Sequence, residues 1–423
     1  MDSRKEVVIT GLGALSPLGI GKTALWQGLE AARSPVRVID WLADTPTPVR
    51  IGAEIPQFNA KEYVRPRKAL KVMSLEIQHG YVAAVLARED AGLDPATVDP
   101  DRLGVVFGAD MLYCHPEELS PVYRQCMDGG EFDFAKFGPA AMKELFPLWM
   151  LLYLPNMVAC HIGISVDGRG PTNTITLGEV SGLLSVIEAA EVIRRGHADV
   201  MLAGGVGNRL SPTPMVYRGE WHLSRRNDDP TGAVRPFDAD RDGTVRGQAA
   251  AAFVLESREH AERRGATILA QIRGMASRFG RPADQVITSD QAIAQSIEGT
   301  LHASGLDPSH VGGVIAHGMA TRQHDRLEAA AIRSVLGDVP VTAPKSFYGT
   351  SGAASSAIDL AVALMALNHR KLPVTLNYRT PDPECPIEVV HQTARTFESQ
   401  RVLTLSQSTS GQAAALLLEG FSC

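Results

Sequence analysis

Apolar and polar positions alternate along the chain in a way that predicts short buried strands and amphipathic helices. The clearest pattern spans residues 172–205. Residues 174–177 favour a strand because threonine and isoleucine are branched at Cβ. Apolar residues then recur with helical spacing up to Arg194, and Gly196 is typical of the residue after a helix. A second apolar run at residues 198–203 predicts a buried strand.

A sharp turn is predicted where the first strand meets this helix. Gly178 can adopt the backbone conformation that such an elbow needs. The next residue then lies at a helix N-terminus, where backbone N–H groups stabilise negative charge and where enzymes place nucleophiles. Here that residue is Glu179, which makes the elbow the main chemical question of the sequence.

The second half of the chain repeats the pattern of the first. The corresponding segments are residues 270–275 with 7–13, 311–317 with 103–110, and 345–367 with 172–196. Such a repeat predicts two similar α/β halves whose elbows face a shared central cleft.

The predicted domains follow from this repeat. Residues 1–255 form the N-terminal half, and residues 256–423 form the C-terminal half. The N-terminal half includes an insertion at residues 111–165, which is rich in turn and aromatic residues. We expect the insertion to cap a pocket or to form an interface.

Composition excludes several classes of function. The net charge of −6 and the pI of about 6.1 give no general case for nucleic-acid binding. The five cysteines follow neither disulfide nor metal spacing, which indicates a reducing, cytoplasmic location. No apolar run approaches the roughly 18 residues of a membrane span, and the N-terminus has no apolar segment of signal-peptide length.

Two further motifs are incomplete. Gly11 and Gly13 lack the third glycine of a dinucleotide-binding turn at the right spacing. Asp238, Asp240 and Asp242 resemble part of a calcium loop, but no glutamate follows at the required distance, so a hydrogen-bonded loop is favoured. The sequence therefore predicts no metal and no bound cofactor.

A local basic cluster precedes a long amphipathic helix that ends near Gly92. The cluster comprises Arg65, Arg67, Lys68 and Lys71. It has two interpretations, a solvated helix face or a docking patch for an acidic partner.

Several motifs together resemble one family across essentially the whole chain. They are residues 8–13 (VITGLG), 170–171 (GP) with the elbow, 195–205 (RGHADVMLAGG), 235–243 (RPFDADRDG), 316–318 (AHG) and 344–346 (PKS). The chain resembles the β-ketoacyl-acyl-carrier-protein synthases, or ketosynthases, of the thiolase fold. The resemblance implies an α/β thiolase-like fold whose two duplicated halves pack as a five-layered αβαβα sandwich.

The resemblance also implies an active site. Ketosynthases carry the acyl chain as a thioester on an elbow cysteine, and two histidines assist decarboxylation of a malonyl group. In this chain Glu179 occupies the cysteine position and Thr350 the position of the second histidine, while His317 and Lys345 are retained. These four residues are the candidate catalytic positions.

Substrate-binding positions follow from the same resemblance. The late glycine-rich loop of the family, which helps to form the oxyanion hole, is replaced here by residues 407–411 (QSTSG). Gln407, Thr409 and Gly411 in this segment, together with Thr321 after the retained histidine, are the candidates.

The chemistry of Glu179 leaves several interpretations open. A carboxylate is a poor thioester-forming nucleophile because the anhydride would hydrolyse. An ionised glutamate cannot donate a hydrogen bond, so decarboxylation needs a protonated Glu179 or compensation from Lys345 and His317. Alternatively, Glu179 only balances the helix N-terminus and forms a salt bridge with Lys345. Neither Cys114 nor Cys160 lies at the elbow.

Three functional hypotheses result. The chain could be a non-condensing subunit, similar to chain-length factors, that forms a heterodimer with an active ketosynthase. It could be a 3-oxoacyl-carrier-protein synthase-like acyltransferase or a malonyl decarboxylase that uses Glu179 and His317. It could also be a non-catalytic homodimer that binds acyl chains or carrier protein. Each predicts an acyl carrier protein as partner, whose phosphopantetheine arm enters the cleft, and a dimer interface at residues 154–175.

Overall fold

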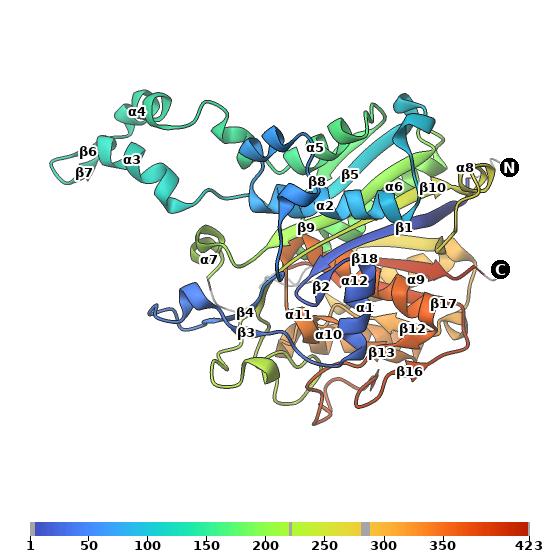
Figure 1. The fold of residues 1–423 in the computed structure, drawn as a ribbon. Coiled ribbons are helices and arrows are strands. Elements are labelled where there is room, and N and C mark those ends of the chain that lie inside the picture. Colours follow the sequence, from blue (N-terminus) through green and yellow to red (C-terminus); the bar gives the residue numbers. More distant parts are fainter. Residues whose placement is uncertain (1–4, 220–221, 281–287, 422–423) are drawn as a thin grey trace.

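A computed structural model describes residues 5–219, 222–280 and 288–421. Its centre consists of two copies of one strand order (Figure 1). In the N-terminal half the order is β1 (Val7–Ser16), β10 (Arg246–Ser257), β9 (Val200–Asn208), β5 (Leu103–Ala109) and β8 (Thr172–Ile175). In the C-terminal half it is β11 (Ala270–Phe279), β18 (Gln412–Glu419), β17 (Arg401–Gln407), β12 (Gly313–Ile315) and β13 (Pro340–Thr342), with β15 (Glu388–Val389) beyond β13.

Strand directions repeat as well as strand order. In each half the first three strands pair antiparallel and the remaining pairs are parallel. The halves join where β1 pairs with β11, at Val8 with Gln271 and Ile9 with Ala270. The predicted duplication is therefore present, and the predicted boundary at residues 255/256 falls in the last residues of β10.

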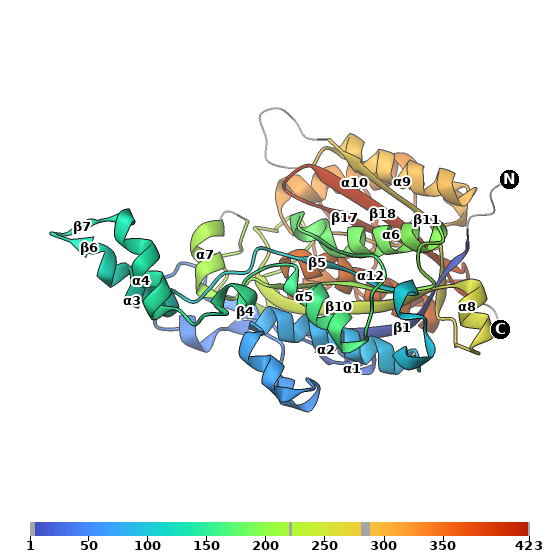
Figure 2. The ribbon, with the colours of Figure 1, turned by 90° about the horizontal axis from the view of Figure 1, so that it is seen from above.

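Helices complete five layers (Figure 2). The central layer is formed by α6 (Ser181–Arg194) and α12 (Ser355–His369), which contact strands of both halves. The outer helices are α2 (Leu75–Asp90) and α5 (Met157–Ser165) on the N-terminal half, and α9 (Asp290–Ser304) and α10 (Arg322–Leu336) on the C-terminal half. This is the predicted αβαβα arrangement.

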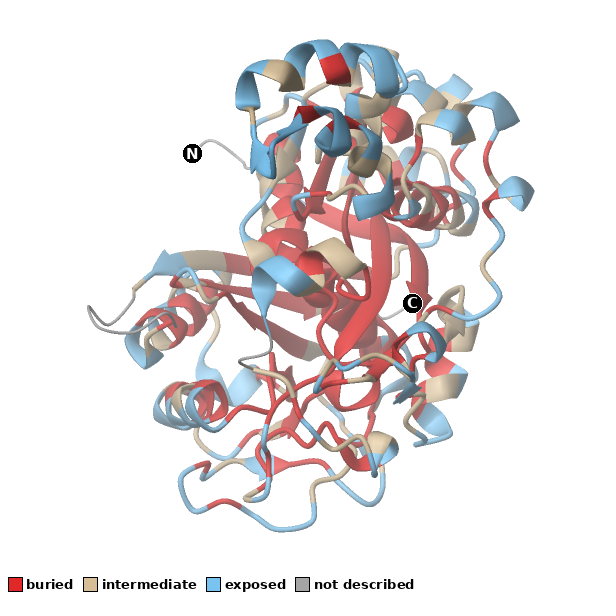
Figure 3. Ribbon diagram, turned by 90° about the vertical axis from the view of Figure 1, so that its left-hand side faces the viewer, coloured by how far each residue is buried: buried red, intermediate tan, exposed pale blue. Residues whose placement is uncertain are grey.

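The sequence of α12 explains its central position. Thirteen consecutive residues, from Ser355 to Leu367, are buried. A helix that is apolar on all sides must lie inside the protein rather than on its surface. Figure 3 shows the resulting buried centre, with most exposed residues on the outer helices and loops.

The two central helices approach each other closely at their N-termini. A Cβ at Gly182 of α6 would lie 2.8 Å from the Cβ of Ala357 and 2.9 Å from the carbonyl oxygen of Ala353. Only glycine permits this approach. Both helices begin directly after an elbow, formed by the 3-10 turns Gly178–Val180 and Gly352–Ala354, so the two elbows meet at the centre of the molecule.

The insertion projects from the body as an arm, defined here as residues 116–150 (Figures 1 and 2). Its elements are α3 (Pro116–Cys126), β6 (Met127–Asp128), β7 (Glu131–Phe132), α4 (Phe137–Glu144) and the start of a 3-10 turn, Trp149–Leu152. It has a small core of its own, made by Val122, Cys126 and Ala140.

The remaining helices and strands are short. They are α1 (Lys22–Glu30), α7 (Pro212–Arg218), α8 (Arg258–Arg263), α11 (Lys345–Tyr348), β2 (Gly19–Ile20), β3 (Arg37–Val38), β4 (Ile51–Ala53), β14 (Lys371–Leu372) and β16 (Arg395–Thr396). Residues 208–227, whose sequence has no clear periodic pattern, contain the short helix α7. No helix within the described ranges is long and apolar enough to cross a bilayer.

Candidate functional site

The elbow has the predicted geometry. Gly178 has φ 66°, and Glu179 follows it at the start of the central helix α6. Ser181 holds the turn, since its hydroxyl accepts a hydrogen bond from the backbone N–H of Leu177 and donates one to the carbonyl of Gly178, each 2.7 Å long. The local sequence therefore fixes where the Glu179 side chain points.

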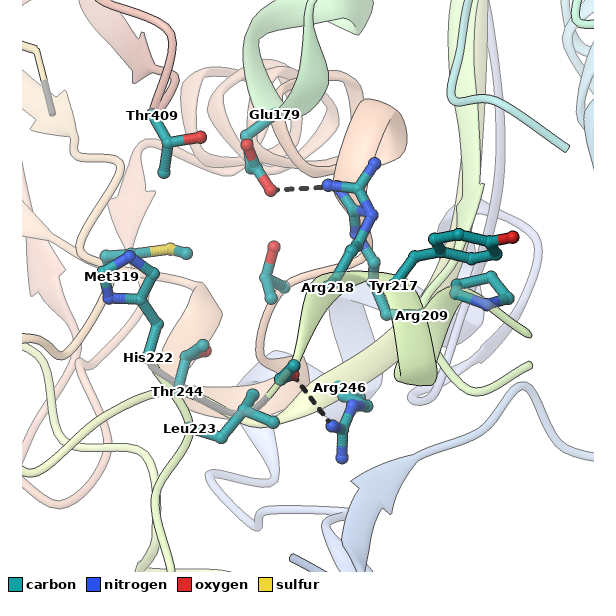
Figure 4. A pocket seen from close by; sticks show the side chains of 13 residues that line it. Glu179, Arg209, Tyr217, Arg218, His222, Leu223, Thr244, Arg246, Met319 and Thr409 are labelled. Atoms are coloured by element: carbon teal, nitrogen blue, oxygen red, sulfur yellow. Dashed lines mark hydrogen bonds and ion pairs between the residues drawn. The ribbon is translucent and has the colours of Figure 1, made fainter. Parts of the chain in front are cut away.

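Glu179 points into a cavity of about 260 Å³ (Figure 4). The cavity is lined by Glu179, Arg209, Pro214, Tyr217, Arg218, Gly219, His222, Leu223, Thr244, Arg246, Met319, Thr350 and Thr409. Glu179 and Thr409 lie on one side of the cavity, and His222, Thr244 and Leu223 lie on the opposite side. Both halves of the chain contribute to it, as the predicted shared cleft requires.

Glu179 is held by an ion pair that the sequence did not reveal. An Nη2 of Arg209 donates to Oε1 of Glu179 at 3.0 Å, and both side chains are buried. The same Nη2 lies 3.3 Å from Oδ2 of Asp110. Arg209 follows β9 and Asp110 follows β5, so the parallel pairing of these strands with β8 brings the three charges together.

Asp110 extends this network to the second half. Its Oδ2 accepts a hydrogen bond of 3.0 Å from the backbone N–H of Ala353, in the second elbow. Its Oδ1 lies 3.3 Å from Nη2 of Arg218 on α7. One buried carboxylate thus connects both elbows and the helix that covers the cavity.

Glu179 is ionised at neutral pH. Burial raises the pKa of its carboxyl, but the Arg209 guanidinium and the residue's own backbone N–H lower it. The cations of Arg218 and Lys345 lower it further, so the pKa lies below the usual 4.5. A protonated Glu179, which decarboxylation by this residue needs, is therefore not the resting state.

Lys345 does not pair with Glu179, in contrast to the predicted salt bridge. Its ammonium group forms an ion pair with Asp359 of α12, and both side chains are fully buried. Tyr348 donates a second hydrogen bond of 3.0 Å to Asp359. The ammonium group of Lys345 is paired with the nearer carboxylate of Asp359. Lys345 therefore affects Glu179 only through the electrostatic effect of its charge, which lowers the pKa of Glu179.

His317 is a buried, neutral histidine outside the cavity lining. Burial, together with Lys345 and His324, lowers its pKa well below 6.5. Its backbone N–H and that of Gly318 donate to the carboxylate of Glu328, at 2.6 and 2.8 Å. Among the described residues its Nδ1 has no hydrogen-bond partner. Met319 lines the cavity in its place.

Thr350 does line the cavity. Its Oγ1 lies 3.3 Å from the hydroxyl of Ser355 and also accepts a weak hydrogen bond from the backbone N–H of Gly352 at 3.5 Å. A hydroxyl at this position lacks the ring nitrogen with which a histidine exchanges a proton near neutral pH.

Of the four predicted substrate-binding positions, one lines the cavity and three do not. Thr409 lines the cavity, and the segment around it lies against the elbow, since Ser406 donates to the carbonyl of Glu179 at 3.4 Å. Gln407 is buried at the end of β17, and Gly411 has φ 102°; neither is in the lining. Thr321 caps α10 and contacts Nδ1 of His324 at 2.7 Å, also outside the lining.

The basic cluster is exposed. Arg65, Arg67, Lys68 and Lys71 are all at the surface, and none forms an ion pair with a carboxylate of the described chain. The interpretation as one face of a long helix is wrong, because these residues precede α2 and lie in and before a 3-10 turn, Arg67–Val72. That turn contacts the turn Trp149–Leu152 at the base of the arm.

Within the described part of the chain, no thiol takes the place of the elbow cysteine. None of the four cysteines in the described part of the chain lines the cavity. Burial raises the pKa of Cys385 to about 12, and burial raises that of Cys114 as well. Both therefore remain protonated thiols, which are weak nucleophiles. Cys423 lies outside the described residues.

Asp238 stabilises the acidic loop whose sequence resembles part of a calcium site. Its carboxylate accepts backbone N–H groups of Asp240 at 2.9 Å and of Arg379 and Thr380 at 2.7 Å each. The predicted hydrogen-bonded loop is confirmed. No group of side chains suited to a metal ion occurs within residues 5–219, 222–280 and 288–421.

Comparison with known proteins shows which proteins share this sequence and fold. The sequence profile described as beta-ketoacyl synthase, N-terminal domain, matches residues 4–261, and that of the C-terminal domain matches residues 269–379. The tetracenomycin polyketide synthase ketoacyl synthase alpha subunit of Streptomyces glaucescens is 35% identical over 422 residues, which cover 98% of this chain and 97% of that protein.

Two solved structures are similar over their full length. The ishigamide ketosynthase/chain length factor has a TM-score of 0.87 at 27% identity. A type II polyketide synthase acyl-carrier protein in complex with its ketosynthase bound to the hexaketide (AntDE:AntF) has a TM-score of 0.86 at 26% identity. Each comparison covers 99% of this chain and 100% of the other. The chain belongs to the β-ketoacyl synthase family and has its thiolase-like fold, with an ionised glutamate at the elbow.

Proposed function

We propose that this chain is a non-condensing subunit of fatty-acid or polyketide biosynthesis, similar to a chain-length factor, that works beside a ketosynthase with an elbow cysteine. The observation that carries the proposal is the buried ion pair between Glu179 and Arg209, 3.0 Å long, at the position where the family attaches the acyl chain. A carboxylate in this state neither forms a thioester nor donates a proton.

The other candidate positions support the loss of condensation. Condensation with a malonyl group needs donors that stabilise the enolate oxygen after carbon dioxide leaves. His317 is outside the cavity lining, and Thr350 replaces the second histidine. Malonyl decarboxylation by Glu179 is disfavoured too, because the ionised side chain repels a malonyl carboxylate.

The edge strand of the N-terminal half supports the proposal of a second subunit. Strand β8 pairs only with β5 among the described strands, and its Thr172 and Asn173 are exposed. Beside it, Ile164 of α5 is 77% exposed. Exposed edges and apolar residues of this kind favour association. The ketosynthase/chain length factor relative supports the choice of a heterodimer, and the exposed residues of β8 and α5 support an interface at residues 154–175.

An acyl carrier protein is the proposed second partner. Carrier proteins are acidic, and the exposed Arg65, Arg67, Lys68 and Lys71 supply unpaired positive charge beside the turn Trp149–Leu152. The complex of a related ketosynthase with its carrier protein supports this role. The carrier would bring the phosphopantetheine arm, so that the chain needs no cofactor of its own, and the proposed location is the cytoplasm.

Intact-mass spectrometry tests the loss of covalent chemistry. The purified chain is incubated with malonyl- and octanoyl-carrier protein, and its mass is expected to stay unchanged. Ketosynthases with an elbow cysteine from the source organism are then assayed with and without it. We expect β-ketoacyl products, or products of defined length, only when both are present.

Two variants sharpen the assay. Glu179→Gln in this chain is expected to leave product formation by the pair unchanged, whereas replacing the elbow cysteine of the partner with alanine abolishes it. An acyl adduct on this chain, or condensation by this chain alone, would refute the proposal.

A further inference from the structure

A second cavity, of about 480 Å³, shares no lining residue with the cavity at the elbow. We call it the α2 cavity, because the first residues of α2 form one wall. Its volume is in the range of small-molecule sites, roughly 300–1,000 Å³. It is lined by Trp41, Glu54, Met73, Ser74, Leu75, Glu76, Tyr113, His115, Leu152, Tyr153, Asn208, Leu210, Ser211, Pro212 and Gln248.

The lining of the α2 cavity is acidic. It contains the carboxylates of Glu54 and Glu76 and neither a lysine nor an arginine. Glu54 is compensated from outside the lining, since Nη2 of Arg37 lies 2.6 Å from its Oε2. Glu76 is only 9% exposed, and it forms no ion pair with a lysine or arginine of the described chain. A buried carboxylate without such a partner is costly, because burial disfavours the charged form.

The chain itself compensates the charge of Glu76 incompletely. Glu76 is the second residue of α2, where its own backbone N–H and the hydroxyl of Ser74 lower the pKa of its carboxyl. The electrostatic effect of His115 lowers this pKa as well. Burial outweighs all three, and Asp110 adds to burial, so the pKa of Glu76 lies above the usual 4.5. A cation in the cavity would supply the missing compensation.

Aromatic rings give the α2 cavity a second feature that favours cations. Trp41, Tyr113 and Tyr153 all line it. The face of an aromatic ring attracts an ammonium group, and the attraction is stronger where water is excluded. Two of the rings are held in place, since the hydroxyl of Tyr153 donates to Glu118 and Tyr113 stacks on Tyr217 with ring centroids 5.3 Å apart. Carboxylate and rings thus favour the same kind of ligand.

The rest of the lining suits the body of an organic molecule rather than a hydrated metal ion. Much of it is apolar, namely Met73, Leu75, Leu152, Leu210 and Pro212. No group of side chains suited to a metal ion occurs in the described ranges. Ligands that carry a carboxylate or a phosphate would be repelled by Glu76. The charge and the surface of the cavity therefore both indicate an amine with a hydrocarbon body.

We propose that the α2 cavity binds a small organic cation, an amine whose ammonium group pairs with Glu76 and whose apolar body packs against Trp41, Tyr113 and Tyr153. The proposal is independent of the function proposed above, because the two cavities share no lining residue. It adds a ligand site to the chain that needs neither a second subunit nor a carrier protein.

Three probes with the same ring and different charge test the proposal by calorimetry on the purified chain. They are 2-phenylethylamine, 2-phenylethanol and phenylacetate. We expect the amine to bind with a Kd of about 0.1–1 mM, as a ligand of this size allows. The alcohol should bind at least about ten-fold more weakly, and phenylacetate should give no binding heat. Hexylamine is the second cationic probe, so that the result does not depend on a phenyl ring.

Variants assign the binding to this cavity. Glu76→Gln keeps the shape of the side chain and removes its charge, so it should weaken amine binding at least about ten-fold and leave binding of the alcohol unchanged. Its melting temperature should stay the same or rise, because an incompletely compensated buried charge is lost. Trp41→Ala should weaken binding of both probes. Asp40→Asn is the matched control, since Asp40 is the acidic neighbour of Trp41, lies outside the lining and is 92% exposed.

Three results would overturn the proposal. One is equal affinity for the amine and the alcohol, and another is amine binding that survives Glu76→Gln. The third is that neither 2-phenylethylamine nor hexylamine binds at concentrations up to about 10 mM. None of these measurements involves acyl transfer or a second subunit, so their failure leaves the proposed function standing, and failure of the proposed function leaves the amine site standing.

Discussion

Arg209→Met removes the cation that two buried carboxylates share, and its effect can be worked out from the structure. At 3.0 Å, one unit-charge pair is worth about 5.5 kcal/mol with an effective dielectric constant of 20. Breaking a buried pair by removing one partner costs about 3–5 kcal/mol in measured cases. We expect the lower end, about 3 kcal/mol, because Arg218 stays 3.3 Å from Asp110.

The same substitution reverses a pH dependence. In the wild type the pKa of Glu179 is lower in the folded chain than its usual 4.5. Its contribution to stability is therefore present above pH 4.5 and is lost as the pH falls below that value. Without Arg209, burial dominates and raises the pKa of Glu179 in the folded state. Stability should then fall, not rise, as the pH increases through 4.5.

Urea unfolding followed by circular dichroism at several pH values measures both effects. A double-mutant cycle with Glu179→Gln isolates the pair, and we expect a coupling of about 2 kcal/mol or more. Arg37→Met is the matched control, because Arg37 also pairs with two carboxylates, Asp40 at 3.0 Å and Glu54 at 2.6 Å, but at the surface. These pairs should contribute about 0–1 kcal/mol each. Equal costs for the two arginine variants, or a coupling near zero, would refute the reasoning.

Three further substitutions test other parts of the structure. Burial raises the pKa of Glu328 to about 7, above its usual 4.5, so the stability of the fold should fall as the pH rises between these values. Glu328→Gln should remove this pH dependence, which urea unfolding midpoints at pH 5 and pH 7 will measure. Lys345→Met leaves Asp359 as an unpaired buried charge and should cost about 3–5 kcal/mol in thermal unfolding, with partial recovery when Asp359→Asn is added. Gly182→Ala should cost about 1–3 kcal/mol because its Cβ would collide with α12, whereas Gly138→Ala meets no atom within 4 Å and should be close to neutral.

Much of the fold follows from local sequence. The elbow at Gly178 needs a residue that tolerates positive φ, and the apolar run of α12 is long enough that it could only be buried. The repeat of strand, elbow and helix then gave the two halves, because the same local pattern produces the same strand order. These features depend on residues close together in the chain.

The charge partners in the site could not be predicted in the same way. Glu179 and Arg209 are 30 residues apart, and Arg209 and Asp110 are 99 apart. Their contact depends on the registers of three strands, which place the ends of β5, β8 and β9 together. Lys345 was a plausible partner for Glu179, but Asp359 lies closer, and nothing in the sequence distinguishes the two carboxylates.

Surface features were only partly predictable for a related reason. The positive charge of Arg65 to Lys71 and its exposure followed from composition. The helix α7 was missed because prolines begin it and it covers only Pro212–Arg218, which is too short for a clear periodic pattern. Arg218 and the cavity wall that α7 provides were missed with it.

The carboxylate of Asp110 also determines how the molecule can move. It bonds the N–H of Ala353 across the halves, and Gly182 leaves no space between the two central helices. Separating the halves would break both contacts, so we expect them to fluctuate as one body. Helix α7 is different, since it exposes Val216 and Tyr217 to solvent and still forms one wall of the cavity. Movement of α7 away from the cavity and back, on the microsecond to millisecond scale typical of such segments, should therefore determine how fast a molecule enters or leaves the cavity.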